Sequence, residues 1–135
     1  MELFFELDKY LSNDYSINYW EDEVLSKAEE LVTRFSEDDW LNIKRKWEEK
    51  PSLWIKYFAQ TLSVGIPKYS IPILYKIIDS QNDEISIIAI DSLRCIDSNL
   101  VKSLITPRLI TKLKELKVKN SGINLLIINE LFKKL

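Results

Sequence analysis

The chain contains no histidine and only one cysteine among its 135 residues. Without histidine it lacks the commonest general base and the commonest metal ligand of proteins. One cysteine cannot supply a zinc site, and catalytic Ser-His-Asp and Cys-His arrangements are excluded. A single cysteine also excludes an internal disulfide framework, which indicates a reducing setting. Because Cys95 lies in an apolar run beside Leu93 and Ile96, we expect its thiol to be buried and inert.

Glycine and proline are also scarce, with two and four residues respectively. All-β folds need many tight turns built from these residues, so the composition favours helices. Gly65 and Gly122 stand alone, which excludes a glycine-rich phosphate loop. The length suits one domain, and an apolar fraction of 46% with four tryptophans can form a core. We therefore expect a single helical domain over residues 1–135.

No apolar run approaches the length of a membrane span. Glu2 and Glu6 stand where a secretory signal would carry positive charge. We therefore expect a cytoplasmic protein that does not bind a membrane.

The net charge of −2 conceals an uneven distribution. Residues 1–50 hold 14 acidic and 7 basic residues, whereas residues 51–135 hold 7 acidic and 12 basic residues. The acidic half could steer a basic partner, or it could be ordinary solvated helix surface. The lysines near residues 112–119 fit a solvated helix end, so we expect no nucleic-acid partner.

Apolar residues recur at helical spacing through most of the chain. Residues 12–19 suit a loop or ragged helix, and Gly65 suits a C-terminal helix cap. The segment 83–96 (DEISIIAIDSLRCI) is ambiguous because isoleucine favours strands, but its polar residues do not alternate. It therefore predicts a helix that is apolar almost all round and packed on both sides. The helices are expected at residues 3–11, 20–34, 37–49, 51–63, 69–79, 83–96, after a Ser98 cap, at 107–118, and from residue 123 onward.

The stretch FSEDDW, residues 35–40, places three consecutive acids between two aromatic residues. Ser36 and Asp39 have the spacing of a capping box, and carboxylates favour the positive end of a helix dipole. Adjacent acids point about 100° apart on a helix and do not share a site. We interpret the stretch as a helix start rather than a metal or catalytic site. Trp40, Trp47 and Trp54 are expected in the core.

The helices arrive in pairs with short links, and loose repeats separate similar residues, such as Ala59 and Ala89. This pattern predicts an all-α fold, a short right-handed stack of antiparallel helix pairs. A compact helical bundle is the alternative.

Aromatic residues in an acidic context before the second main helix suggest a protein-binding patch, because we expect them to be exposed. The concave helices near 51–63 and 83–96 are rival surfaces. The candidate partner-binding residues are Asp14, Tyr15, Tyr19, Trp20, Glu21, Asp22 and Glu23. The residues suggest no cofactor and no enzyme activity.

The run from Trp20 to Leu62 resembles bacterial immunity proteins built from HEAT-like helical repeats. These proteins guard against polymorphic or contact-dependent growth-inhibition toxins. The resemblance is carried by an acidic helix followed by Phe35-Ser36, Asp39-Trp40, Trp47, Pro51, Trp54, Ala59 and Leu62, and by DEISIIAIDSL as a HEAT-like second helix. It covers residues 20–96 and implies a HEAT-like α-solenoid that binds a cognate toxin domain, often a nuclease with a basic cleft, in a 1:1 complex. The alternative function is a HEAT-like adaptor for another protein.

Overall fold

A computed structural model describes residues 2–135, and all regular secondary structure in that part of the chain is helical. The segments are α1 (Glu2–Leu11), α2 (Ile17–Tyr19), a π-helix (Trp20–Val24), α3 (Leu25–Thr33), α4 (Glu37–Lys46), a 3₁₀ turn (Trp47–Glu49), α5 (Ser52–Thr61), a 3₁₀ turn (Leu62–Val64), α6 (Pro67–Ser80), α7 (Asp83–Arg94), α8 (Ser98–Ser103), α9 (Pro107–Lys119) and α10 (Gly122–Phe132). The expected all-α class is confirmed. Among the described residues, no helix is long and apolar enough to cross a bilayer.

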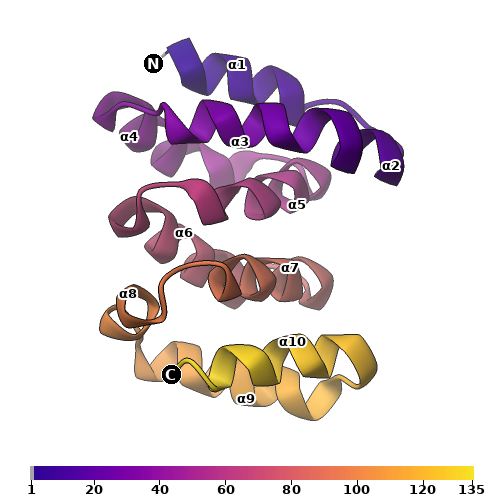
Figure 1. Ribbon diagram of the computed structural model, residues 1–135, viewed down its shortest axis with the longest axis vertical. Coiled ribbons are helices and arrows are strands. Elements are labelled where there is room, and N and C mark those ends of the chain that lie inside the picture. Colours follow the sequence, from indigo (N-terminus) through magenta and orange to yellow (C-terminus); the bar gives the residue numbers. More distant parts are fainter. Residues whose placement is uncertain (1) are drawn as a thin grey trace.

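The helices follow one another down the long axis of the molecule, from α1 at one end to α9 and α10 at the other (Figure 1). The ambiguous segment 83–96 is helical over Asp83–Arg94, which is α7, as its polar pattern predicts. α7 packs against α5 and α6 on the N-terminal side and against α10 on the C-terminal side. Because α7 has helical neighbours on both sides, its isoleucines face protein almost all round.

The core changes character along the chain. Trp40, Trp47 and Trp54 are 1–2% exposed, as expected. Trp40 packs against Tyr69 of α6, and Trp47 and Trp54 both pack against Phe58 of α5. Beyond α5 most of the buried side chains are isoleucine or leucine. Aromatic rings therefore hold the N-terminal layers together, and aliphatic side chains hold the C-terminal ones.

The capping box at the start of α4 is confirmed. Ser36 Oγ accepts a hydrogen bond from the Asp39 N–H at 3.2 Å, and the Asp39 carboxylate accepts one from the Ser36 N–H at 3.0 Å. Asp39 is also buried, and its second oxygen accepts a hydrogen bond from the Phe4 N–H at 3.3 Å. The carboxylate therefore both starts α4 and contacts the backbone of α1.

Cys95 is exposed, so the expectation of a buried thiol is wrong. Its neighbours Leu93 and Ile96 are buried as expected. Cys95 follows Leu93 by two residues, or about 200° around a helix, and this places the thiol on the opposite face.

One expectation about helix ends is wrong and another is confirmed. Asp97, not Ser98, caps α8, because its carboxylate accepts the Asn99 N–H at 2.8 Å. Gly65 is the C-terminal cap of the 3₁₀ turn after α5, where its N–H donates to the Leu62 carbonyl at 3.1 Å, but its backbone is extended (φ −75°, ψ 167°) and not left-handed. A Cβ at this position would lie 2.6 Å from Cη2 of Trp40, so Gly65 makes room for the indole.

Candidate protein-binding site

The acidic segment before α3, residues 14–24, contains two short helical turns, α2 and the π-helix. Ser16 begins α2, because its Oγ accepts the Tyr19 N–H at 3.2 Å. The chain then widens into the π-helix, which carries Glu21, Asp22 and Glu23 on the surface. Single-turn π-helices are rare and frequently mark functional sites.

Trp20 is buried, with 3% of its surface exposed, so the expectation of an exposed indole is wrong. Its ring stacks on Tyr57 of α5 with 4.2 Å between centroids, and its Nε1–H donates to Gln60 Oε1. The large ring and its N–H both find partners on α5, which removes Trp20 from solvent. Trp20 therefore fastens the acidic segment to α5 instead of presenting itself to a partner.

Tyr15 and Tyr19 remain at the surface. Tyr15 is half-buried and Tyr19 is 54% exposed, and their rings stack with centroids 5.8 Å apart. Tyr15 is fixed from two directions: its Oη donates to the Tyr10 carbonyl at 2.6 Å, and its N–H donates to Tyr57 Oη at 3.1 Å. The two tyrosines thus form a positioned aromatic surface above Trp20.

A cleft of about 320 Å³ opens between the acidic segment and α5. Asp14, Tyr15, Trp20 and Glu21 line it, whereas Tyr19, Asp22 and Glu23 lie outside its lining. The remaining lining residues are Ile17, Leu53, Lys56, Tyr57 and Gln60. The predicted acidic patch and the helix near 51–63, which is an alternative binding surface in the sequence analysis, therefore line the same cleft.

Two further clefts continue from this one across the stack. A cleft of about 280 Å³ shares Glu21 and Gln60 with the first and extends to Ile88 and Asp91 of α7. A cleft of about 340 Å³ shares Ile88 and Asp91 and reaches α10. We call this chain of three clefts the acidic groove.

Carboxylates dominate the groove. Its charged lining consists of Asp14, Glu21, Asp83, Glu84 and Asp91, with one base, Lys56. Lys56 pairs with Glu84 at 2.9 Å, and Asp91 pairs with Arg94. In residues 2–135 no base forms a salt bridge with Asp14, Glu21 or Asp83. The groove thus keeps negative charge available to a ligand.

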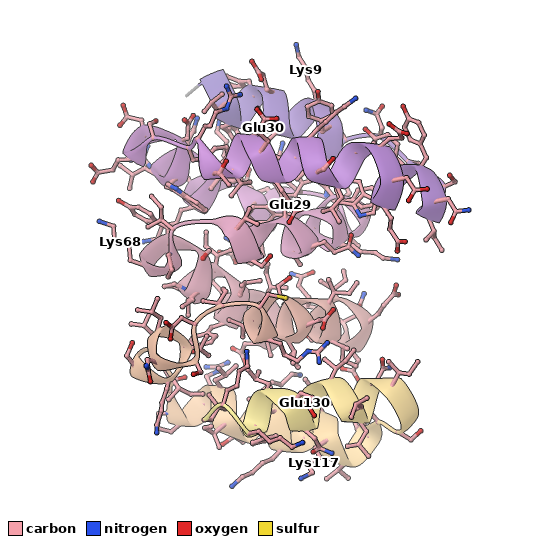
Figure 2. All side chains as sticks on the ribbon, in the orientation of Figure 1. Lys9, Glu29, Glu30, Lys68, Lys117 and Glu130 are labelled. Carbon is pink, nitrogen blue, oxygen red and sulfur yellow. The ribbon has the colours of Figure 1, made fainter. Side chains whose placement is uncertain are left out.

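Leu25 of α3 lines the middle cleft, and Glu29 lies one helical turn further along the same helix. Figure 2 places Glu29 at the edge of α3 nearer α5 and Glu30 at the opposite edge. Burial raises the pKa of Glu29 above its ordinary value. Glu29 therefore takes up a proton at a higher pH than an exposed glutamate does.

The residues of α5 and α7 that line the groove were not singled out from the sequence. Glu84, Ile88, Asp91 and Cys95 recur at i, i+4, i+7 and i+11, which is the spacing of one helical face. These residues form a mixed polar and apolar stripe on a helix whose other face is apolar and packs in the core. Such a stripe is the sequence feature that indicates a binding surface on α7.

The carboxylates are spread along the groove and do not converge. Among the described residues, no three His, Cys, Asp or Glu side chains gather closely enough to hold a metal ion. What the arrangement offers is an extended negative surface with apolar and aromatic patches, which suits recognition of a basic protein surface.

Comparison of the chain with models of protein families, with curated proteins and with solved structures finds no match.

Proposed function

We propose that this protein is an immunity protein that binds a cognate bacterial toxin domain and neutralises it by stoichiometric blocking. The observation that carries the proposal is the acidic groove, in which no base of residues 2–135 forms a salt bridge with Asp14, Glu21 or Asp83. Tyr15 lines this groove and Tyr19 stacks on Tyr15 beside it. Nuclease toxins need basic clefts to hold nucleic acid, and a negative groove complements such a surface. The resemblance of residues 20–96 to HEAT-like immunity proteins supports the same function.

The fold that fits this function is a short right-handed stack of HEAT-like helix pairs, not a compact bundle. The order of the helices along the long axis supports it (Figure 1), as does the position of α7 between α5 and α10. Such a stack leaves one helix of each pair along a continuous face, and that face can bind an extended partner surface.

Within this function the residues in the groove and beside it have different roles. Asp14, Glu21 and Asp83 would attract a basic partner and speed the encounter. Tyr15 and Tyr19 would contact the partner and slow its dissociation, since tyrosine is enriched in interface hot spots. Trp20 would hold Tyr15 in place, both directly and through Tyr57, and Tyr15 in turn stacks on Tyr19.

The test is co-purification with the product of the adjacent upstream gene, followed by growth protection against that product. We expect the wild-type protein to bind and protect, and a Glu21→Lys/Asp91→Lys variant to lose both. A matched control, Glu30→Lys/Glu115→Lys, makes the same charge change at exposed positions outside the groove lining and should still protect. Binding without protection would favour the adaptor function, and absence of both would refute the immunity function.

A further inference from the structure

A second cleft lies between α4 and α6 and has the opposite character to the acidic groove. It has a volume of about 240 Å³, and three lysines line it: Lys44, Lys68 and Lys76. In Figure 1 α4 and α6 lie at the left of the molecule and α2 lies at the right, and Figure 2 shows Lys68 projecting from the left edge. The cleft is therefore distinct from the site already described.

The walls of this cleft are aromatic and aliphatic. Trp40, Trp47 and Ile73 are at most 6% exposed, so they present a firm apolar surface at its base. Tyr69 stacks almost parallel on Trp40, with 5.5 Å between centroids and 14° between the ring planes. Gly65 packs against the far edge of the Trp40 ring, which further restricts the indole. The cleft is thus built before any ligand arrives.

Two of the three lysines at this cleft have no carboxylate partner among the residues that the structure describes. Lys76 pairs with Glu48 at 2.6 Å, but in residues 2–135 no carboxylate forms a salt bridge with Lys44 or Lys68. Lys68 Nζ instead lies over the Tyr69 ring, 4.9 Å from its centroid. Lys44 and Lys68 come from different helices, so an anion between them could contact both elements.

The backbone at this cleft lacks a donor that a ligand could supply. Pro72 lies inside α6 and has no N–H, so the carbonyl of Lys68 lacks its usual helical donor. A peptide can supply an N–H to this carbonyl, whereas a simple carboxylic acid has no N–H to offer.

We propose that the α4–α6 cleft binds an acidic segment of a partner protein, which inserts one large apolar side chain between the two helices. The volume suits a single side chain and is below that of most cofactor sites. Lys68 and Lys76 are eight residues apart on α6, or about 12 Å. About four residues of extended chain cover that distance, so carboxylates two residues before and two residues after the anchor reach both lysines. Lys76 already pairs with Glu48, but its ammonium has three donors and can bind a second carboxylate beside it. This binding requires neither the acidic groove nor a toxin.

The test uses pentapeptides acetyl-Glu-Gly-X-Gly-Glu-amide, with Leu, Phe, Tyr or Trp as X, and a matched panel with Gln in place of Glu. Binding is followed by the four tryptophan indole N–H signals in ¹H–¹⁵N spectra of the whole protein. We expect acidic peptides to shift the Trp40 and Trp47 signals in a saturable manner while leaving Trp20 unchanged. The Gln panel should bind about tenfold more weakly or not at all, because charge-assisted contacts are lost.

Variants separate this site from the groove. Lys44→Gln/Lys68→Gln should weaken binding of the acidic peptides about tenfold, Lys44→Arg/Lys68→Arg should retain it, and Glu21→Lys/Asp91→Lys should leave it unchanged. Both lysines are exposed, so all variants should keep the wild-type circular-dichroism spectrum. Absence of a Trp40 shift at about 1 mM of every acidic peptide would overturn the proposal, as would equal binding of the Gln panel. Phenylacetate, a simple aromatic acid without an N–H, serves as a further probe, and tighter binding of phenylacetate than of the acidic peptides would also overturn it.

Discussion

Asp39 carries two structural tasks on a single carboxylate. One oxygen accepts the Ser36 N–H at 3.0 Å and the other accepts the Phe4 N–H at 3.3 Å. Burial acts to raise the pKa of Asp39, but the hydrogen bonds to its carboxylate, including those from Ser36 and Phe4, outweigh burial and lower the pKa below its usual value. We expect Asp39→Asn to lower the free energy of unfolding by about 1–3 kcal/mol, and Ser36→Ala by about 0.5–2 kcal/mol.

The pH dependence of Asp39→Asn follows from the direction of that shift. A lowered folded-state pKa stabilises the protein above the unfolded-state pKa, and this stabilisation is lost as the pH falls through the folded-state pKa. The wild-type protein should therefore lose stability more steeply than Asp39→Asn as the pH falls below about 4. Urea denaturation of the wild-type protein and Asp39→Asn at pH 7 and pH 3 measures how much stability each loses. Equal losses would contradict a lowered pKa for Asp39.

Gly65 gives a second prediction at this scale. A Cβ there would lie 2.6 Å from Cη2 and 2.9 Å from Cζ2 of Trp40. Gly65→Ala should therefore destabilise the protein by about 1–3 kcal/mol through overpacking. The ring of phenylalanine lacks those two atoms, so Gly65→Ala should cost less in a Trp40→Phe background, which a double-mutant cycle by chemical denaturation would measure. Equal costs in both backgrounds would mean that Trp40 is not the obstacle.

At the scale of elements, the sequence predicts those features that depend only on the spacing of nearby residues. The α4 cap depends on residues three apart, and the helical nature of α7 depends on a pattern within 14 residues; both are confirmed. The contact of Asp39 with Phe4 joins residues 35 apart, and the burial of Trp20 depends on Tyr57 and Gln60, which lie far along the chain. No local sequence pattern contains these pairings. The sequence therefore predicts the acidic segment correctly, but the prediction that Trp20 is exposed is wrong.

The buried position of Trp20 changes the expected effect of its mutation. Trp20→Ala removes a ring stacked on Tyr57 and leaves Gln60 without its indole donor. It should lower the free energy of unfolding by about 3–5 kcal/mol, as for other buried tryptophans. Tyr19→Ala, at a 54% exposed position, should stay within about 0.5 kcal/mol of wild type. Thermal or urea denaturation of both variants tests whether Trp20 stabilises the fold while Tyr19 does not. Similar stabilities for the two variants would contradict these roles.

At the scale of the whole molecule, charge is divided between two faces. The acidic groove runs from the segment before α3 across α5 and α7 to α10, whereas the α4–α6 cleft carries lysines. The net charge of −2 therefore says little about what either face attracts. A partner that approaches the groove meets five carboxylates and one lysine, so the local charge is more negative than the net charge implies.

This division predicts how the proposed binding to the upstream gene product should respond to salt. Exposed charges are screened over about 10 Å at 0.1 M salt, so the association rate should fall as salt rises, while the dissociation rate should change little. Glu21→Lys/Asp91→Lys should lower the association rate and flatten its salt dependence. Tyr19→Ala should raise the dissociation rate, since its contact forms only in the docked complex. Stopped-flow or surface-plasmon-resonance kinetics at several salt concentrations measure both rates. The control Glu30→Lys/Glu115→Lys has the same net charge as the groove variant, so an equal loss of association rate in the control would show that overall charge, and not the acidic groove, steers the partner.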